Sequence, residues 1–351
     1  MKICSRCVMD ETDPEIQFDE QGVCNHCRRH EYLSKHYDKN TLLPTIEQIK
    51  KDGEGKKYDC LVGLSGGVDS CYVLIKAVEW GLRPLAMTFD NGWDTPQAGN
   101  NVKTMISILS VPHVTVEIDL DNYHKAQIAL MKAGTPDVEL ITDHILSDQL
   151  YEIAIENDIK WVLTGSNYQS ESHLAWSYDW SDWLYIKNML KRNGFDGDYK
   201  KLPHYGKLKQ RRLKKKVTIF SPLQYMDYDK EKVKQMLINK CGWEDYGGKH
   251  YESTWTKFFQ VYYLPKKFGY DKRKCHLSAL ISSGQMTREE ALKKLEEPLE
   301  KVNITPILEK IGLTRAEFDH IMTMEKHTYH DYLNYGKFTN YYFRKRWKGL
   351  K

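Results

Sequence analysis

The chain has 351 residues, with 52 lysines and arginines against 48 aspartates and glutamates, which gives a formal net charge of +4. This length can bury a sizeable core and suggests two or more structural units, while so mild a charge gives no argument for nucleic-acid or membrane binding. The uninterrupted apolar stretches fall far short of the roughly 20 residues that cross a bilayer, and the N-terminus carries no apolar signal region. We therefore expect a soluble, cytoplasmic protein without membrane contact.

The N-terminal segment carries an ordered group of cysteines. Two CxxC pairs, typical of a tetrahedral zinc site, are formed by Cys4, Cys7, Cys24 and Cys27. Because four thiolates leave no open position, the metal is expected to support the fold and to take no part in chemistry. His26, between the second pair, is expected at the surface. The other four cysteines are scattered and are expected to be small buried or incidental thiols: Cys60, Cys71, Cys241 and Cys275.

Residues 1–50 are thus expected to form a zinc ribbon and a polar linker. Beyond them, apolar runs and helical periodicity alternate, with strands expected at 59–63, 84–89, 113–118 and 161–164 and helices at 70–79, 100–109 and 144–156. This alternation predicts an α/β fold with a parallel sheet covered on both faces. Ligands of such sheets bind beyond the carboxyl ends of the strands, where the loops at 65–70, 90–92 and 165–167 would converge.

The first of these loops has the sequence SGGVDS and spans residues 65–70 between a short apolar strand and a helix. Gly66 and Gly67 allow the backbone to approach an oxyanion, and the free amides and dipole of the following helix favour negative charge. Ser65 and Ser70 add hydroxyl groups. Asp69, a carboxylate beside a phosphate site, indicates a bridging Mg²⁺. Neither the lysine of a P-loop nor a dinucleotide GxGxxG motif is present.

SGGVDS after a strand resembles the pyrophosphate loop (PP-loop) of the ATP pyrophosphatases, the superfamily of asparagine synthetase, GMP synthetase and the tRNA thiolases. The resemblance implies a domain of the adenine nucleotide α-hydrolase, HUP-like type over 51–228, with ATP and Mg²⁺ as cofactors. It implies that adenine lies near Met87 and Thr88 and that a second loop at Gly165 and Asn167 faces the nucleotide. Asp90 could contact ribose or metal, or serve only in a turn or helix cap.

An aromatic and then basic insertion near 176–216 interrupts this pattern. Its cations are Lys207, Lys209, Arg211, Arg212, Lys214, Lys215 and Lys216. An RNA-binding arm, a guide for an anionic substrate and a solvated helix face all remain open. Residues 229–351 are expected to be mostly helical and to bind substrate, with capping boxes that begin at Thr287 and Thr314.

A more specific resemblance covers nearly the whole chain. It rests on CSRCVMD (4–10), FDEQGVCNHC (18–27), SGGVDS, GGKHYES (247–253), DKR (271–273) and HLS (276–278). Together these motifs resemble the N-acetyl sugar amidotransferase family of bacterial surface polysaccharide and flagellar sugar pathways. The resemblance implies that an acetamido group of a UDP- or CMP-linked sugar becomes an acetamidino group through an O-adenylyl imidate. Lipopolysaccharide O-antigen and pseudaminic acid pathways are the expected setting.

The cluster near residue 250 combines cations for a diphosphate or carboxylate with groups that could carry the protons of ammonia. The substrate-binding candidates are Lys249, Ser253, Lys272 and Arg273, and the catalytic candidates are Asp69, His250 and Glu252. Structural salt bridges are the alternative for each charged member. The aromatic residues at 255–263 are expected in the core.

Ammonia is expected to come from another protein, because residue 2 is Lys and no cysteine lies in a Gly-x-Cys-x-Gly sequence. A separate glutaminase and an ammonia-channelling, HisF-like subunit are therefore the expected partners, as the family resemblance also implies. Two other functions remain open. A thiolase-like tRNA-modifying enzyme would need a catalytic cysteine such as Cys60 or Cys71, and nucleic acid is not the expected partner. The other is a zinc-ribbon module that only binds nucleotide.

Overall fold

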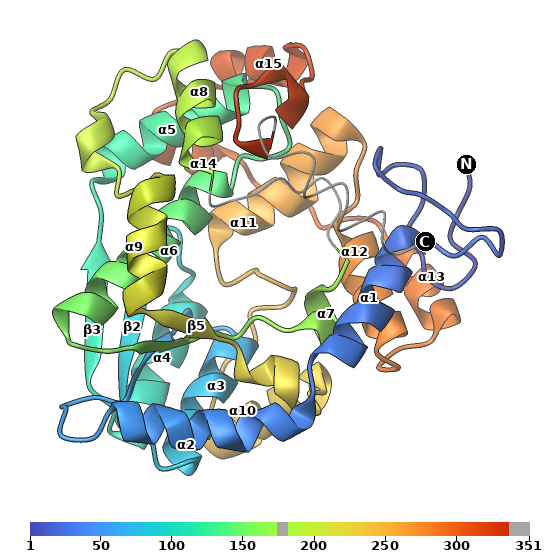
Figure 1. The fold of residues 1–351 in the computed structure, drawn as a ribbon. Coiled ribbons are helices and arrows are strands. Elements are labelled where there is room, and N and C mark those ends of the chain that lie inside the picture. The colour runs from blue at the N-terminus through green and yellow to red at the C-terminus, as the bar shows by residue number, and fades with distance from the viewer. Residues whose placement is uncertain (174–181, 337–351) are drawn as a thin grey trace.

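The computed structural model describes residues 1–173 and 182–336 (Figure 1). Its centre is a five-stranded parallel sheet with the order β3-β2-β1-β4-β5. The strands are β1 Cys60–Gly63, β2 Pro84–Asp90, β3 His113–Glu117, β4 Trp161–Leu163 and β5 Thr218–Phe220. The expected α/β class with a parallel sheet is confirmed.

Helices cover both faces of the sheet because successive side chains of a strand point to opposite sides. On one face, Cys60 and Val62 pack with α2 (Leu42–Asp52), α3 (Val68–Glu79), α4 (Pro96–Leu109) and α10 (Lys230–Cys241). On the other face, Leu61 packs with α6 (Leu140–Glu156) and α9 (Lys207–Lys216). The sheet is therefore buried on both sides.

A second, mostly helical core lies beside the sheet (Figure 1). It combines α5 (Leu120–Lys132) and α8 (Trp183–Arg192) with C-terminal elements, namely α11 (Thr254–Phe258), a π-helix (Phe259–Phe268), α12 (Arg273–Ser282), α14 (Thr305–Ile311) and α15 (Arg315–Thr323). Trp255, Phe258 and Tyr263 are buried in it, which confirms the expectation of aromatic core residues. Short 3-10 helices lie at Lys39–Thr41, Tyr199–Lys201, Pro222–Tyr225 and Tyr329–Asp331.

The N-terminal segment folds as a cysteine-bearing ribbon that leads into α1 (Asn25–His36). α1 lies beside α12, and the one-turn helix α7 (Tyr168–Glu171) lies between them and the sheet (Figure 1). α13 (Arg288–Glu296) packs on α12. Both expected capping boxes are present, at the starts of α13 and α15. The ribbon is thus held by elements from distant parts of the chain.

Several predicted boundaries differ from the structure. The helix expected from residue 100 begins at Pro96, because Thr95 caps it and proline suits a first helical turn. The helix expected from residue 144 begins at Leu140. α5 and β5 were not predicted, and β5 has only three residues, too few for a periodic pattern. Residues 176–181 of the expected insertion and 337–351 of the expected C-terminal region lie outside the described residues.

The expected domain limits at residues 50 and 228 remain predictions. α10 follows the second limit, yet packs on α3 of the sheet. Within the described part of the chain, no helix is long and apolar enough to cross a membrane.

Candidate active site and metal site

The loop between β1 and α3 is held in a closed shape by its own hydroxyl groups. Ser70 Oγ donates to the Gly67 carbonyl at 3.1 Å and lies 3.2 Å from Ser65 Oγ, which accepts from the Gly67 amide at 3.3 Å. Gly66 has a φ of +76°, and a Cβ there would lie 2.3 Å from the Ala98 carbonyl oxygen. Only glycine fits this position, because both the conformation and the contact exclude a side chain.

Gly67 is the N-cap residue of α3 and, as a glycine, has no side chain that could accept hydrogen bonds from the first amides of the helix. The first amides of α3 are thus oriented toward the loop, as an anion site requires. The geometry of the loop therefore fits a phosphate group. Whether Ser65, Gly66, Gly67 and Ser70 bind ATP remains a prediction.

Asp69 is the centre of a partly buried charge network that the sequence did not reveal. Its carboxylate accepts from Lys230 Nζ at 2.9 Å, from the Tyr228 hydroxyl and, at 3.4 Å, from Asn167 Nδ2. Burial alone would raise the pKa of Asp69, but Lys230 and Tyr228 hold it below its usual value. The carboxylate is thus ionised, as a magnesium ligand must be. Lys230 was missed because no local motif connects it to a loop 161 residues away.

The loop after β4 lies directly against this network. A Cβ on Gly165 would lie 2.9 Å from Asp69 Cβ, so glycine permits the close approach. Asn167 caps α7 by accepting from the Ser170 amide at 2.8 Å. The structure thus brings the two loops together at the carboxyl end of the sheet.

The residues expected near adenine have side chains that are already engaged. Met87 is buried in the core, and Thr88 Oγ1 donates to the Leu64 carbonyl at 3.0 Å. Asp90 accepts from the Gly92 amide at 2.8 Å, which is the turn role that had been left open for it. A nucleotide contact at Met87 or Thr88 would therefore use the strand backbone.

The second cluster reaches the phosphate loop through Glu252. Its Oε1 lies 3.4 Å from where a Cβ on Gly67 would stand, and its Oε2 is buried without a hydrogen-bond partner. His250, in a left-handed conformation with φ 62°, lies between two carboxylates, with Nδ1 3.5 Å from Glu252 and Nε2 3.6 Å from Glu171. Burial would raise the pKa of Glu252, but His250 lowers it. The structure thus brings His250 and Glu252 together beside the loop, and their expected catalytic role remains a prediction.

The other expected substrate-binding residues differ in their surroundings. Lys249 Nζ donates to the Ser170 carbonyl at 2.7 Å and pairs with Glu171, and burial lowers its pKa. Ser253 caps α11. Arg273 binds Asp271 and carbonyl groups near the end of α13, which gives its guanidinium a structural role.

Lys249, Lys272 and Arg273 line a cavity of about 710 Å³ between α10, α12 and the segment 243–251. Its wall includes Val68 in the first turn of α3, so the cavity extends to the phosphate loop. Ligand pockets of this size accommodate drug-sized and nucleotide-sized molecules. The cavity and the loop therefore form one continuous candidate site.

Three acidic residues near this site have strongly raised pKa values, and the sequence did not single them out. Surrounding protein raises the pKa of Asp94 to about 7, of Glu139 to about 8 and of Asp143 to about 6. Asp94 and Asp143 are nevertheless solvent-exposed. Neighbouring acidic side chains contribute to each raised pKa: Asp90 and Glu252 act on Asp94, Asp143 and Glu252 on Glu139, and Glu171 on Asp143.

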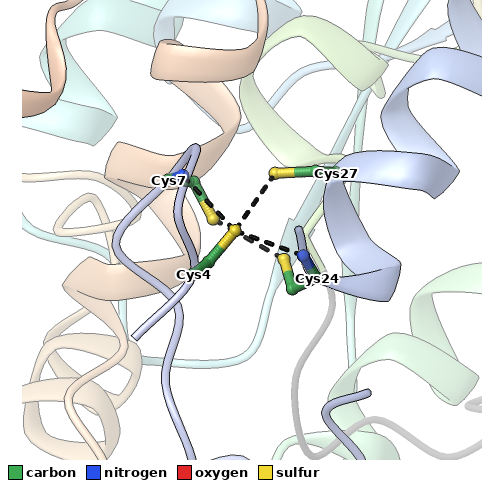
Figure 2. Close-up of side chains that lie close together, drawn as sticks. All are labelled: Cys4, Cys7, Cys24 and Cys27. Carbon is green, nitrogen blue, oxygen red and sulfur yellow. Dashed lines mark hydrogen bonds between the residues drawn. The ribbon is translucent and has the colours of Figure 1, made fainter. Parts of the chain in front are cut away.

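The four N-terminal cysteines gather at one point, with all sulfur atoms within 4.8 Å of one another (Figure 2). Backbone amides donate to the sulfurs, as metal-bound thiolates require. Cys4 Sγ accepts from the amides of Arg6, Cys7 and Cys24 at 3.2–3.5 Å. The group is buried and fits a tetrahedral metal ion such as zinc. The expectation for His26 was wrong, because this ring is buried and lies 2.7 Å from Asp13.

The basic insertion forms the helix α9, with Leu213 buried on one side. Lys209 pairs with Asp148 and Glu152, while Arg211 and Arg212 are exposed. This arrangement is that of an ordinary solvated helix. An RNA-binding role gains no support from it.

One family model matches the C-terminal segment, and several solved structures are similar over a larger part of the chain. Residues 252–346 match the family described as "LPS biosynthesis protein WbpG-like, C-terminal domain". No curated protein matches the chain.

Among solved structures, NMN synthetase from Francisella tularensis is similar at 16% identity and a TM-score of 0.32, over 86% of this chain and 98% of that one. The U34-tRNA thiolase NcsA from Methanococcus maripaludis, with its 4Fe-4S cluster, has 14% identity and a TM-score of 0.36, over 87% and 91%. The NH3-dependent NAD synthetase from Campylobacter jejuni has 15% identity and a TM-score of 0.29, over 61% and 93%. TM-scores this low carry no argument about activity.

Proposed function

We propose that this protein is an ATP-dependent amidotransferase acting on a nucleotide-activated N-acetyl sugar, because residues 252–346 match the WbpG-like C-terminal domain family of lipopolysaccharide biosynthesis. One observation carries the proposal. The first residue of the matched segment, Glu252, lies against Gly67 of the phosphate loop. The segment related to surface-sugar synthesis thus supplies a carboxylate to the site expected to activate ATP.

The proposed reaction has two steps whose atoms balance. The acetamido oxygen attacks the α phosphorus of ATP, the bond to pyrophosphate breaks, and an O-adenylyl imidate forms. Ammonia then attacks the imidate carbon, AMP leaves with the former amide oxygen, and an acetamidino group remains. No covalent enzyme intermediate is needed.

The residues of the loop contribute positioning and charge. Ser65, Ser70 and the amides at Gly66 and Gly67 hold the phosphates, and the first turn of α3 favours their negative charge. Asp69 would hold a Mg²⁺ ion, which when bound neutralises the leaving pyrophosphate. Lys230, paired with Asp69 at 2.9 Å, is the proposed cation for the phosphates once Asp69 binds the metal ion.

His250 and Glu252 are the proposed proton carriers for the second step. Their imidazole and carboxylate lie 3.5 Å apart beside Gly67, where ammonia would lose protons as the new bond forms. Lys249 and Lys272 line the cavity next to them and would bind the diphosphate of the sugar nucleotide. We propose that a separate glutaminase and a HisF-like subunit deliver the ammonia.

The direct test uses pure protein with ATP, Mg²⁺, ammonium and a panel of UDP- and CMP-linked diacetamido sugars, including precursors of O-antigen and pseudaminic acid. We expect AMP release together with a product lighter by the difference between an oxygen atom and an NH group. Glutamine alone should not replace ammonium. AMP release with bulk tRNA and with none of the sugars would favour the tRNA-modifying alternative.

We propose zinc as the metal of the four-cysteine site, with a structural role. Metal analysis should then give one zinc per chain. If the analysis found iron and the protein had the absorption spectrum of an iron–sulfur cluster, the assignment of zinc would be refuted. The amidotransferase proposal would be unaffected.

A further inference from the structure

The one-turn helix α7 contacts the phosphate site at one end and the cysteine ribbon at the other. At its start, Asn167 Nδ2 lies 3.4 Å from Asp69 Oδ1. Within the turn, the Ser170 carbonyl accepts from Lys249 Nζ at 2.7 Å, and the Glu171 carboxylate lies 3.2 Å from the same nitrogen. The position of α7 therefore sets the surroundings of two charged residues of the candidate site.

At the other end of α7, side chains connect it to the ribbon. Arg29 of α1 donates to the Ser172 carbonyl at 2.8 Å, and His30 Nδ1 lies 3.0 Å from Ser172 Oγ. His173 Nδ1 lies 3.0 Å from the same hydroxyl, and its Nε2 lies 3.8 Å from Cys27 Sγ. His173 is only 2% exposed, so no solvent competes for these contacts.

These contacts can form a continuous series of hydrogen bonds when Cys27 is a metal-bound thiolate. A metal-bound thiolate accepts hydrogen bonds and donates none, and Nε2 of His173 can supply the proton to Cys27. The Ser282 hydroxyl is a neighbour of both groups, 3.5 Å from Nε2 and 3.8 Å from Cys27 Sγ. Nδ1 of His173 then accepts from the Ser172 hydroxyl, whose oxygen accepts from His30 Nδ1. If the metal leaves, coordination no longer fixes the position of Cys27 Sγ, and the contact of this sulfur with His173 is no longer held in place.

We propose that the ribbon positions the phosphate site through α7, with His173 as the positioning residue, so that metal binding and nucleotide binding strengthen each other. This inference rests on the proposed function only in requiring that a nucleotide binds at the loop. Because linkage is reciprocal, the factor by which metal tightens nucleotide binding equals the factor by which nucleotide tightens metal binding.

The test measures both factors without turnover. Calorimetry measures the binding of α,β-methylene-ATP with Mg²⁺ to protein that holds the metal at its four cysteines and to protein stripped of that metal. A chromogenic chelator measures how well the four cysteines retain their metal with and without the analogue. We expect matching factors of about 5 or more, the lower range of ordinary coupling energies.

His173→Phe keeps the ring volume and all four cysteines but removes the donor to Cys27. We expect this variant to retain the metal and to bind the analogue more weakly than the wild type. The factor by which the metal changes analogue affinity should be near 1. Ser172→Ala should act in the same direction if His173→Phe does not fold. Ser5→Ala is the matched control, because its hydroxyl donates to the Gln21 carbonyl inside the ribbon, away from α7.

The outcomes separate this inference from the proposed function. Analogue binding that is independent of metal, or full coupling in His173→Phe, would overturn the inference alone. A metal-loaded wild-type protein that binds no analogue would overturn the proposed function and the inference together.

Discussion

Replacing Lys230 by methionine should expose the cost of the charge network at the phosphate loop. Lys230 and Asp69 form an ion pair at 2.9 Å, with side chains 23% and 16% exposed. Removing one partner of a buried pair costs about 3–5 kcal/mol, because the remaining charge is left uncompensated. Tyr228 and Asn167 still donate to Asp69, so we expect the lower end, about 3 kcal/mol.

The assay is urea unfolding of the wild type and the variant, followed by tryptophan fluorescence. Lys76→Met is the matched control, because Lys76 pairs with Glu79 on the surface of α3, the helix that carries Asp69, and Glu79 is 56% exposed. Surface pairs of this kind contribute at most about 0.5 kcal/mol. The double variant Lys230→Met with Asp69→Asn should have a higher free energy of unfolding than Lys230→Met alone, because the unpaired charge of Asp69 is then absent.

The pH dependence gives a second readout of the same pair. The pKa of Asp69 is lowered in the folded state, so its ionised form contributes stability above the unfolded pKa, and this contribution is lost as pH falls through the folded value. Lys230→Met should weaken this acid-side dependence. If Lys230→Met cost no more than Lys76→Met, the charge network would not be a stabilising feature.

Three further predictions concern the loop at residues 65–70, the carboxyl group of Glu139 and the metal at the four cysteines. Gly66→Ala should cost about 3 kcal/mol in urea unfolding, and Gly81→Ala only about 1 kcal/mol. Both glycines have positive φ, but only a Cβ at Gly66 meets Ala98, so equal losses would refute the contact argument. The pKa of Glu139 is raised to about 8, so wild-type stability should fall relative to Glu139→Gln as pH rises from about 5 to about 8, and parallel pH profiles would contradict this. Cys7→Ser should lower the metal content and the melting temperature together, and unchanged stability on metal loss would argue against a structural metal.

Local patterns predicted a large part of the candidate site. SGGVDS predicted a tight loop between a strand and a helix, because the glycines and hydroxyls that shape this loop are neighbours in sequence. The four cysteines predicted their cluster because CxxC spacing presents paired sulfurs whatever the fold around them. The surroundings of the predicted residues were harder to foresee. Ser253 and Arg273 carry the residue types of a binding site, but the structure uses them to cap α11 and to anchor the end of α13.

Glu139 and Asp143 were missed in the sequence for a different reason. Glu139 and Asp143 stand near the start of α6 and look like surface charges in sequence, since nothing nearby marks them. Their pKa values rise through desolvation by the surrounding protein and through neighbouring carboxylates, Asp143 beside Glu139 and Glu171 beside Asp143. Burial of this kind depends on the packing of whole elements and leaves no local signature.

The sequence by itself determined the features that depend on neighbouring residues: the alternation of strands and helices, the shape of the phosphate loop and the four-thiolate cluster. Only the tertiary structure decided the partners of Asp69, the approach of Glu252 to Gly67 and the connection of Cys27 to α7. These contacts join segments far apart in the chain, 161 residues in the pair of Lys230 with Asp69. Their existence depends on how α10 packs on the sheet and how α7 and α12 pack with the ribbon, which periodicity and motifs do not encode.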